Sequence, residues 1–158
     1  EVKMHPEARL AELGYELPPV PPAPGRPYEA AVQVGNVVYG SGNTSMDRLT
    51  GEVYRGQVGG DVDLEAARQY ARVALLNALA GLKSHLGDLA RIKRFVRLTG
   101  YVNSHPTFTR QPEVMNAASE LLLAVFGEAG RHARSAIGVA QLPAGATVEV
   151  EVIVEVET

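Results

Sequence analysis

The sequence contains no cysteine and no tryptophan among its 158 residues. The absence of cysteine excludes disulfide bonds, thiolate catalysis and zinc sites built on sulfur. It also fits a protein kept in a reducing cytoplasm, where disulfides are rare. No apolar run approaches the roughly 20 residues that a membrane helix needs, and the first residues lack the basic and apolar segments of a signal peptide. The sequence therefore predicts a cytoplasmic protein without a membrane span.

An excess of basic residues is also missing, because 15 Lys and Arg stand against 18 Asp and Glu, for a formal net charge of −3. Nucleic-acid binders draw much of their affinity from basic residues, so this charge balance argues against a nucleic-acid partner. The basic run from Arg91 to Arg97 could touch RNA, but we interpret it as an exposed edge strand that charge protects from aggregation. No metal is expected, because the histidines lack the spacing and neighbouring carboxylates of a metal site. These histidines are His5, His85, His105 and His132.

Hydrophobic periodicity predicts an α+β fold with two long helices. Apolar residues at helical spacing predict one helix between Asp61 and Gly87 and another over 112–126. Each helix has a single apolar stripe, so both must cover the same face of a sheet. The strands are expected in a hairpin around Gly35-Asn36, over residues 91–102, and in two C-terminal segments joined by a Pro/Gly turn.

The first 26 residues differ in composition from the rest. "PEARLAEL" at 6–13 predicts a short helix, and the prolines of 17–27 predict an extended connector. We therefore divide the chain into a helical and proline-rich extension, 1–26, and a domain, 27–158, that together form one compact unit.

The C-terminal stretch carries the most informative charges. In "VEVEVIVEVE", residues 148–157, the valines are expected to face the helices, and Ile153 interrupts the glutamate face as an oligomer interface would. Arg134 begins a small apolar strand, where a guanidinium needs a partner. A glutamate of the last strand, predicted to be adjacent, and the carboxylate of a ligand are equally good candidates.

These segments resemble the Rid (reactive intermediate deaminase) or YjgF family. "ARSAIGVAQLPAGATVEVEVIV" is similar to its signature of Arg-Ser, a short apolar strand, Leu-Pro, a turn and Val-Glu-hydrophobic-Glu. "RPYEAAVQVGNVVYGSGN", "TGEV" and "NAASELLLAVFG" resemble further family segments in the same order. The first 26 residues resemble the extension of a longer-chain branch.

The resemblance implies a chorismate-mutase-like mixed sheet with both long helices on one face. It also implies a homotrimer whose sheets form a central barrel with clefts between subunits. Family members hydrolyse 2-imino and enamine acids, such as 2-aminoacrylate or 2-iminobutyrate, to 2-keto acids and ammonia without a metal or organic cofactor. Arg134 would bind the substrate carboxylate, and Glu149 would orient or activate water. The pocket residues implied are Tyr28, Ser41, Gly42, Asn116 and Ala136, the last at a position where the family often has cysteine.

Three other functions compete with imine hydrolysis. A non-catalytic protein of the same fold could bind small carboxylates through Arg134. A pathway-specific enzyme could act on a larger imine or enamine. A ribonuclease or translation-inhibiting role, reported for some relatives, fits poorly with the net acidity and the lack of aromatics beside basic residues.

Overall fold

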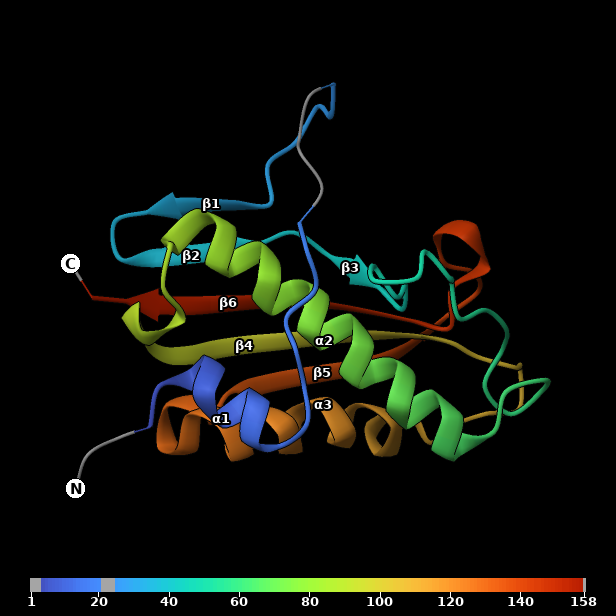
Figure 1. Cartoon of the computed structure of the whole chain (residues 1–158). Helices are drawn as coiled ribbons and strands as arrows, with labels where there is room; N and C mark the ends of the chain where they lie inside the picture. The colour runs from blue at the N-terminus through green and yellow to red at the C-terminus, as the bar shows by residue number, and fades with distance from the viewer. Residues whose placement is uncertain (1–3, 21–24, 158) are drawn as a thin grey trace.

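The computed structural model describes residues 4–20 and 25–157. Within these residues, six strands form one mixed sheet in the order β1-β2-β6-β4-β5, and β3 pairs with β6. Figure 1 shows α2 and α3 lying over the same face of this sheet. The predicted α+β architecture is therefore confirmed. The elements are α1 (Pro6–Glu12), β1 (Ala31–Val34), β2 (Val37–Gly40), β3 (Asn43–Thr44), α2 (Leu64–Leu86), β4 (Ile92–Asn103), α3 (Gln111–Phe126), β5 (Ala133–Val139) and β6 (Val148–Val156).

Local signals in the sequence set the ends of α2. The Asp63 carboxylate accepts a hydrogen bond from the Ala66 amide at 2.8 Å, which caps the first turn. Gly87 ends the helix with a φ of 80°, a conformation that glycine adopts without strain. The expected apolar stripe is buried against the sheet. Its fully buried members include Ala67, Ala71, Ala74, Leu75, Leu79 and Leu82.

The two C-terminal strands are not neighbours, contrary to the sequence-based prediction. β5 pairs in parallel with β4, and β6 pairs antiparallel with the opposite edge of β4. The connection includes a short helical turn over Pro143–Gly145. Eight residues, 140–147, separate the strands, which is enough chain to pass the end of one intervening strand of about 5 Å width. The Pro/Gly turn could therefore be predicted from the sequence. That the connection passes the end of β4 could not.

The basic run from Arg91 to Arg97 does not lie on an edge strand, so that interpretation is wrong. It belongs largely to β4, which lies between β6 and β5 in the sheet interior. The Arg91 guanidinium donates to the Leu86 carbonyl at 2.9 Å. The Arg97 guanidinium donates to the Ser135 hydroxyl at 2.5 Å. At least two of these cations therefore have structural partners.

The two faces of the sheet differ sharply in burial. On β6 the valines at even positions from 148 to 156 are buried toward the helices, as predicted. The register places Glu149, Tyr39 and Ile153 on the opposite face, because directly paired residues point to the same side. That open face is half apolar. Its exposed side chains include Val32, Val34, Tyr39 and Ile137.

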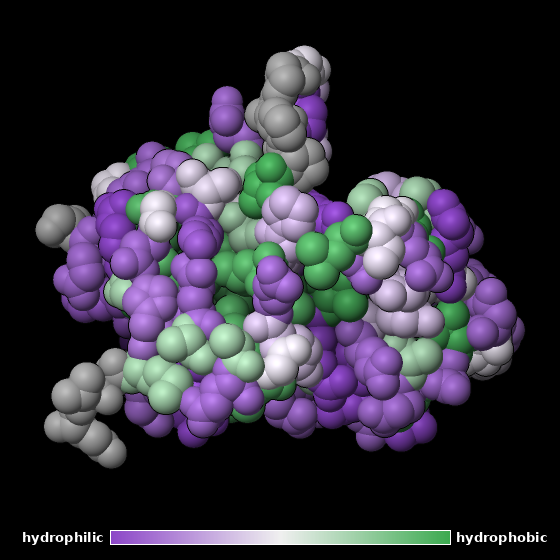
Figure 2. Space-filling view, in the orientation of Figure 1, coloured by the Kyte–Doolittle hydropathy of each residue, from purple (hydrophilic) through white to green (hydrophobic). Residues whose placement is uncertain are grey.

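The N-terminal segment packs against the body of the molecule. α1 contacts α3, and its Leu10 is buried. Glu7 forms an ion pair with Lys83 of α2 at 2.8 Å. The predicted helix over 6–13 is confirmed to within one residue, whereas residues 21–24 of the predicted connector lie outside the described residues. Figure 2 shows apolar surface gathered where the segment after α1 crosses α2. The division at residue 26 stays a prediction.

Candidate functional site

A cavity of about 310 Å³ brings together four of the predicted site residues. Tyr28 comes from the segment before β1, Ser41 and Gly42 from the break between β2 and β3, and Glu149 from β6. The break between β2 and β3 therefore forms part of the cavity wall. The remaining lining residues are Val20, Arg26, Ala30, Asn43, Thr44, Met46, Arg48, Gly81 and Pro143.

Backbone contacts hold the strand break in place. The Ser41 amide donates to the Ala30 carbonyl at 2.9 Å, and its hydroxyl donates to the Glu29 carbonyl at 2.5 Å. The Ser41 oxygen can still accept a hydrogen bond from a ligand or water. Gly42 lies directly against the Glu149 carboxylate, and a Cβ there would clash with that group. Any larger residue at position 42 would therefore force the Glu149 carboxylate to move.

The Glu149 carboxylate has no partner in the part of the chain that the structure describes. Burial raises the pKa of Glu149, and the neighbouring charge of Glu151 raises it further. Among the described residues, the Glu149 side chain has neither a hydrogen bond nor an ion pair. Glu151 instead accepts a hydrogen bond from the Tyr101 hydroxyl at 2.5 Å, and this bond is the main cause that raises the pKa of Tyr101 to about 12. Glu149 is therefore the carboxylate available to water or a ligand.

Two arginines, Arg26 and Arg48, line the same cavity and were missed by sequence reasoning. Burial lowers the pKa of Arg48, and the charge of Arg26 lowers it further. One Arg48 nitrogen donates to the Asn43 side-chain oxygen at 2.5 Å, while Nη1 is buried without a partner in the described part of the chain. Both arginines stand in irregular segments. Arg48 belongs to no quoted motif, and Arg26, which begins the segment RPYEAAVQVGNVVYGSGN, was not among the site residues that the resemblance implied.

Arg134 belongs to a second cluster, at the junction of β5 and α3. Its guanidinium donates to the Asn116 side-chain oxygen at 2.9 Å and to the Ser119 hydroxyl at 3.2 Å. His132 contacts the same hydroxyl through Nε2 at 2.9 Å. Burial lowers the pKa of Arg134. Asn116, which the resemblance implies as a pocket residue, therefore lies beside Arg134. Together with Leu123 and Arg131, these residues line a cavity of about 250 Å³.

Arg134 and Glu149 do not meet within one chain. Arg134 pairs with Leu98 of β4, which is buried on the helix face, whereas Glu149 pairs with Tyr101 on the open face. The two predicted site residues therefore lie on opposite faces and are separated by β4. No glutamate of β6 contacts Arg134 in the described residues. Ala136 pairs with Gly100 and packs against the core, away from the Glu149 cavity.

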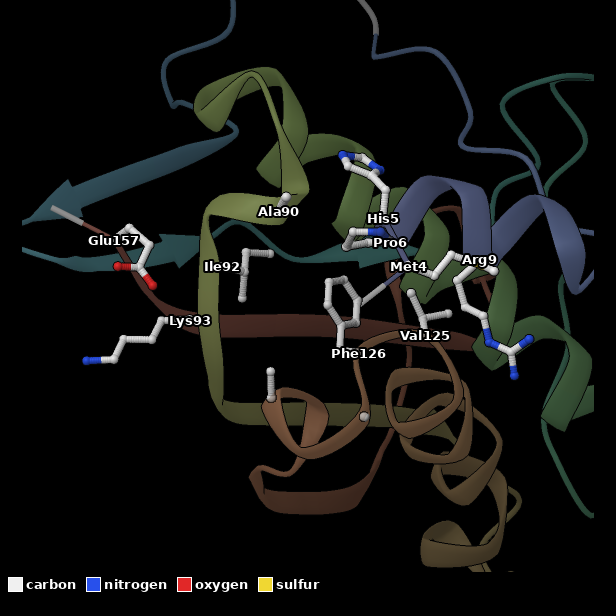
Figure 3. A pocket seen from close by; sticks show the side chains of 12 residues that line it. Met4, His5, Pro6, Arg9, Ala90, Ile92, Lys93, Val125, Phe126 and Glu157 are labelled. Atoms are coloured by element: carbon white, nitrogen blue, oxygen red, sulfur yellow. The ribbon is translucent and has the colours of Figure 1, made fainter. Parts of the chain in front are cut away.

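A further cavity, of about 520 Å³, lies near the two chain ends and holds none of the predicted site residues. Figure 3 shows the start of α1 facing the end of α3 across it, with Phe126, Val125 and Ile92 as its apolar part. Its greater volume does not make it the candidate site, because its carboxylate belongs to Glu157, which is exposed, whereas Glu149 is half-buried. No cluster of three or more His, Cys, Asp or Glu that could hold a metal ion occurs over residues 4–20 and 25–157.

Comparisons with known proteins agree with this fold. A family model described as "YjgF/chorismate_mutase-like, putative endoribonuclease" matches residues 7–156. The chain belongs to this family. Protein TCP17 of Trypanosoma cruzi is 44% identical over 149 residues, which cover 94% of this chain and 92% of that protein. A 2-iminobutanoate/2-iminopropanoate deaminase of Dermatophagoides farinae is 33% identical, covering 88% of this chain and 93% of that one.

The YjgF family match extends to solved structures. The crystal structure of a protein of unknown function from Agrobacterium tumefaciens is 42% identical, with a TM-score of 0.88. The match covers 96% of this chain and 94% of that one. Because the family model begins at residue 7, it includes nearly all of α1. Within the described residues, this YjgF family member has no helix long and apolar enough to cross a membrane.

Proposed function

We propose that the protein hydrolyses reactive 2-imino and enamine acids to 2-keto acids and ammonia. The observation that carries this proposal is the Glu149 carboxylate, which has a raised pKa, has no partner among the described residues and lies in a cavity lined by Tyr28 and Ser41. A carboxylate of raised pKa is a stronger base than an exposed one, which suits it to take a proton from water. The deaminase name of the mite relative supports the same reaction class.

The proposed reaction needs only a positioned water and a proton carrier. Glu149 takes a proton from water as the oxygen forms a bond to the electrophilic carbon of the protonated imine, and the C=N double bond becomes a single bond. Glu149 then returns this proton to nitrogen, the C–N bond breaks as ammonia leaves, and Glu149 takes the hydroxyl proton as the C=O bond of the 2-keto acid forms. The departing ammonia carries the last proton away as ammonium, which leaves Glu149 ionised again. An enamine first gains a proton on carbon to become the imine. No oxidant or reductant is needed, because imine and ketone carbons have the same oxidation level.

Arg134 would bind the substrate carboxylate from a neighbouring copy. Because Arg134 and Glu149 lie on opposite faces of one sheet, the two groups meet only if different chains supply them. We propose a homotrimer whose open sheet faces form a central barrel, with a site in each cleft between subunits. The half-apolar open face, with Tyr39 and Ile137 exposed, supports such an assembly.

The other predicted residues take supporting roles in this proposal. Asn116 orients the Arg134 guanidinium. Tyr28 and Ser41 line the side of the cavity, and Gly42 leaves room for the Glu149 carboxylate. The backbone at Ala136 would hold water where many relatives have a thiol. Residence in the cytoplasm remains a prediction from composition.

The test is the decay of 2-iminobutyrate generated in situ by a threonine dehydratase. We expect the protein to accelerate the decay and Arg134→Ala or Glu149→Gln to reduce this acceleration by about 100-fold or more. Arg72→Gln on α2, outside the cavity, is the matched control. Unchanged decay combined with thermal stabilisation by 2-keto acids would contradict the enzyme and favour the small-carboxylate binder. A solution mass of one chain would contradict the trimer.

A further inference from the structure

The Glu149 cavity carries more positive charge than binding one carboxylate requires. Arg26 and Arg48 both line it, and the charge of Arg26 lowers the pKa of Arg48. Two guanidinium groups in one partly buried cavity repel each other unless an anion lies between them. Glu149 does not serve as that anion for Arg48, because no ion pair joins them in the described residues. The Arg48 guanidinium therefore has no countercharge among the described residues, and this is a feature separate from Arg134.

Arg48 is held firmly in its position. The preceding Asp47 carboxylate accepts a hydrogen bond from the Leu49 amide at 2.8 Å, which fixes the turn around Arg48. Asn77 of α2, itself buried, donates to the backbone carbonyls of Thr44 and Met46 at 3.0 and 2.7 Å. This anchors the segment that leads to Arg48 to the core. A guanidinium on such a segment loses little conformational freedom when it binds a ligand.

The hydrogen bonds of the Arg48 guanidinium leave one edge unused. Nη2 donates to the Asn43 side-chain oxygen, and Asn43 in turn donates to the Ser41 carbonyl at 3.0 Å. Nη1 is buried and has no partner among the described residues. A buried donor without an acceptor is costly, and a carboxylate supplies the acceptor geometry that a guanidinium fork matches best. The neutral amide of Asn43 already orients the Arg48 guanidinium without compensating its charge. An anionic ligand would supply the missing acceptor and the missing negative charge.

We infer that the cavity takes 2-imino acids that carry a second carboxylate on the side chain. Arg48, with Arg26, would bind that side-chain carboxylate, while the neighbouring copy's Arg134 binds the carboxylate next to the imine carbon. The side chain would then extend past Glu149 into the same chain's cavity. A volume of about 310 Å³ suits a small diacid. This inference rests on the proposed function, for which it names the substrate class.

Stable keto acids test the inference without requiring turnover. We would titrate the protein with 2-oxoglutarate, a 2-keto diacid, and with 2-oxobutyrate, a 2-keto monoacid, by calorimetry at one ionic strength. We expect the diacid to bind about tenfold more tightly or better, because it adds charge-assisted hydrogen bonds. In Arg48→Gln this ratio should fall to near one. The control Arg72→Gln should retain the ratio of the unchanged protein.

A second variant and the turnover assay keep the outcomes distinct. Arg26→Gln should also lower the diacid-to-monoacid ratio, which protects the test if Arg48→Gln folds poorly by circular dichroism. Equal affinity for the two keto acids, or a ratio that survives both substitutions, would overturn the inference. Failure to hydrolyse the imines of both keto acids would instead count against the proposed function and leave the affinity ratio readable.

Discussion

The Glu149 cavity and the Arg134 cluster are opposite in charge and in the way they are built. Arg134 is fixed by hydrogen bonds to the neutral side chains of Asn116 and Ser119. Glu149 has no such bond and is held by its strand and by close contact with Gly42. Burial shifts the pKa of each toward the neutral form, downward for Arg134 and upward for Glu149. Each charge therefore lacks its countercharge within the described chain.

This difference fits the proposal that one group binds the substrate and the other reacts with it. A guanidinium held by neutral acceptors keeps its positive charge uncompensated and correctly aimed at an anion. A carboxylate without donors keeps its lone pairs for a water molecule and can exchange a proton more readily. We interpret Arg134 as the carboxylate anchor and Glu149 as the proton carrier of one site that two copies share.

The largest expected effect comes from recombining the two clusters. Arg134→Ala and Glu149→Gln should each be nearly inactive alone. Co-refolding equal amounts should restore about one quarter of the sites, because random assembly pairs an intact Arg134 with an intact Glu149 in about one interface of four. The measurement is 2-iminobutyrate decay before and after mixing. No recovery from correctly assembled mixed oligomers would show that the site is not shared between copies.

The next largest effect on activity is expected from a substitution that displaces the Glu149 carboxylate. Gly42→Ala places a Cβ against the carboxylate and should lower kcat/KM by about tenfold, because the proton carrier is displaced. Gly81→Ala is the matched control in the same cavity, since its nearest neighbours lie 3.9 Å away. That control should be active and slightly more stable, because alanine favours the α2 helix. Equal activity of the two variants would argue against a role for Glu149 in the chemistry.

The elements could be predicted from the sequence because their signals are local. Asp63 and Gly87 mark the ends of α2 within a few residues of chain. The relation between Arg134 and Glu149 could not be predicted, because it depends on which strand lies between β5 and β6. The role of Arg48 in the cavity was equally hidden, since it depends on a contact of its loop with the distant, buried Asn77. The family resemblance indicated which residues belong to the site. The fold was needed to show on which face of the sheet each of them lies.

A smaller effect is expected where α3 meets the sheet beneath the Arg134 cluster. Gly100 of β4 lies against Met115, so Gly100→Ala would force the side chain or the helix to move. We expect a loss of about 1–3 kcal/mol in the free energy of unfolding, as overpacking of a core typically causes. Because Asn116 is adjacent to Met115, keto-acid affinity should also fall. Denaturant unfolding measures the first effect and calorimetry the second. Unchanged stability would show that Met115 repacks freely.

The smallest expected effect concerns stability and pH at Glu149. Its pKa is raised above the ordinary value of 4.5, so the folded state binds the proton more tightly than the unfolded state does. The protein therefore loses stability as the pH rises from about 4.5 through the raised pKa of the folded state, and Glu149→Gln removes this loss. We expect the variant to melt roughly 1–3 °C higher than the unchanged protein at pH 7.

The difference in melting temperature should shrink below pH 4, where Glu149 is protonated in both the folded and the unfolded state. Thermal unfolding followed by circular dichroism across this pH range gives the comparison. A variant that is less stable at pH 7 would show that the ionised carboxylate has a stabilising partner in the assembled protein.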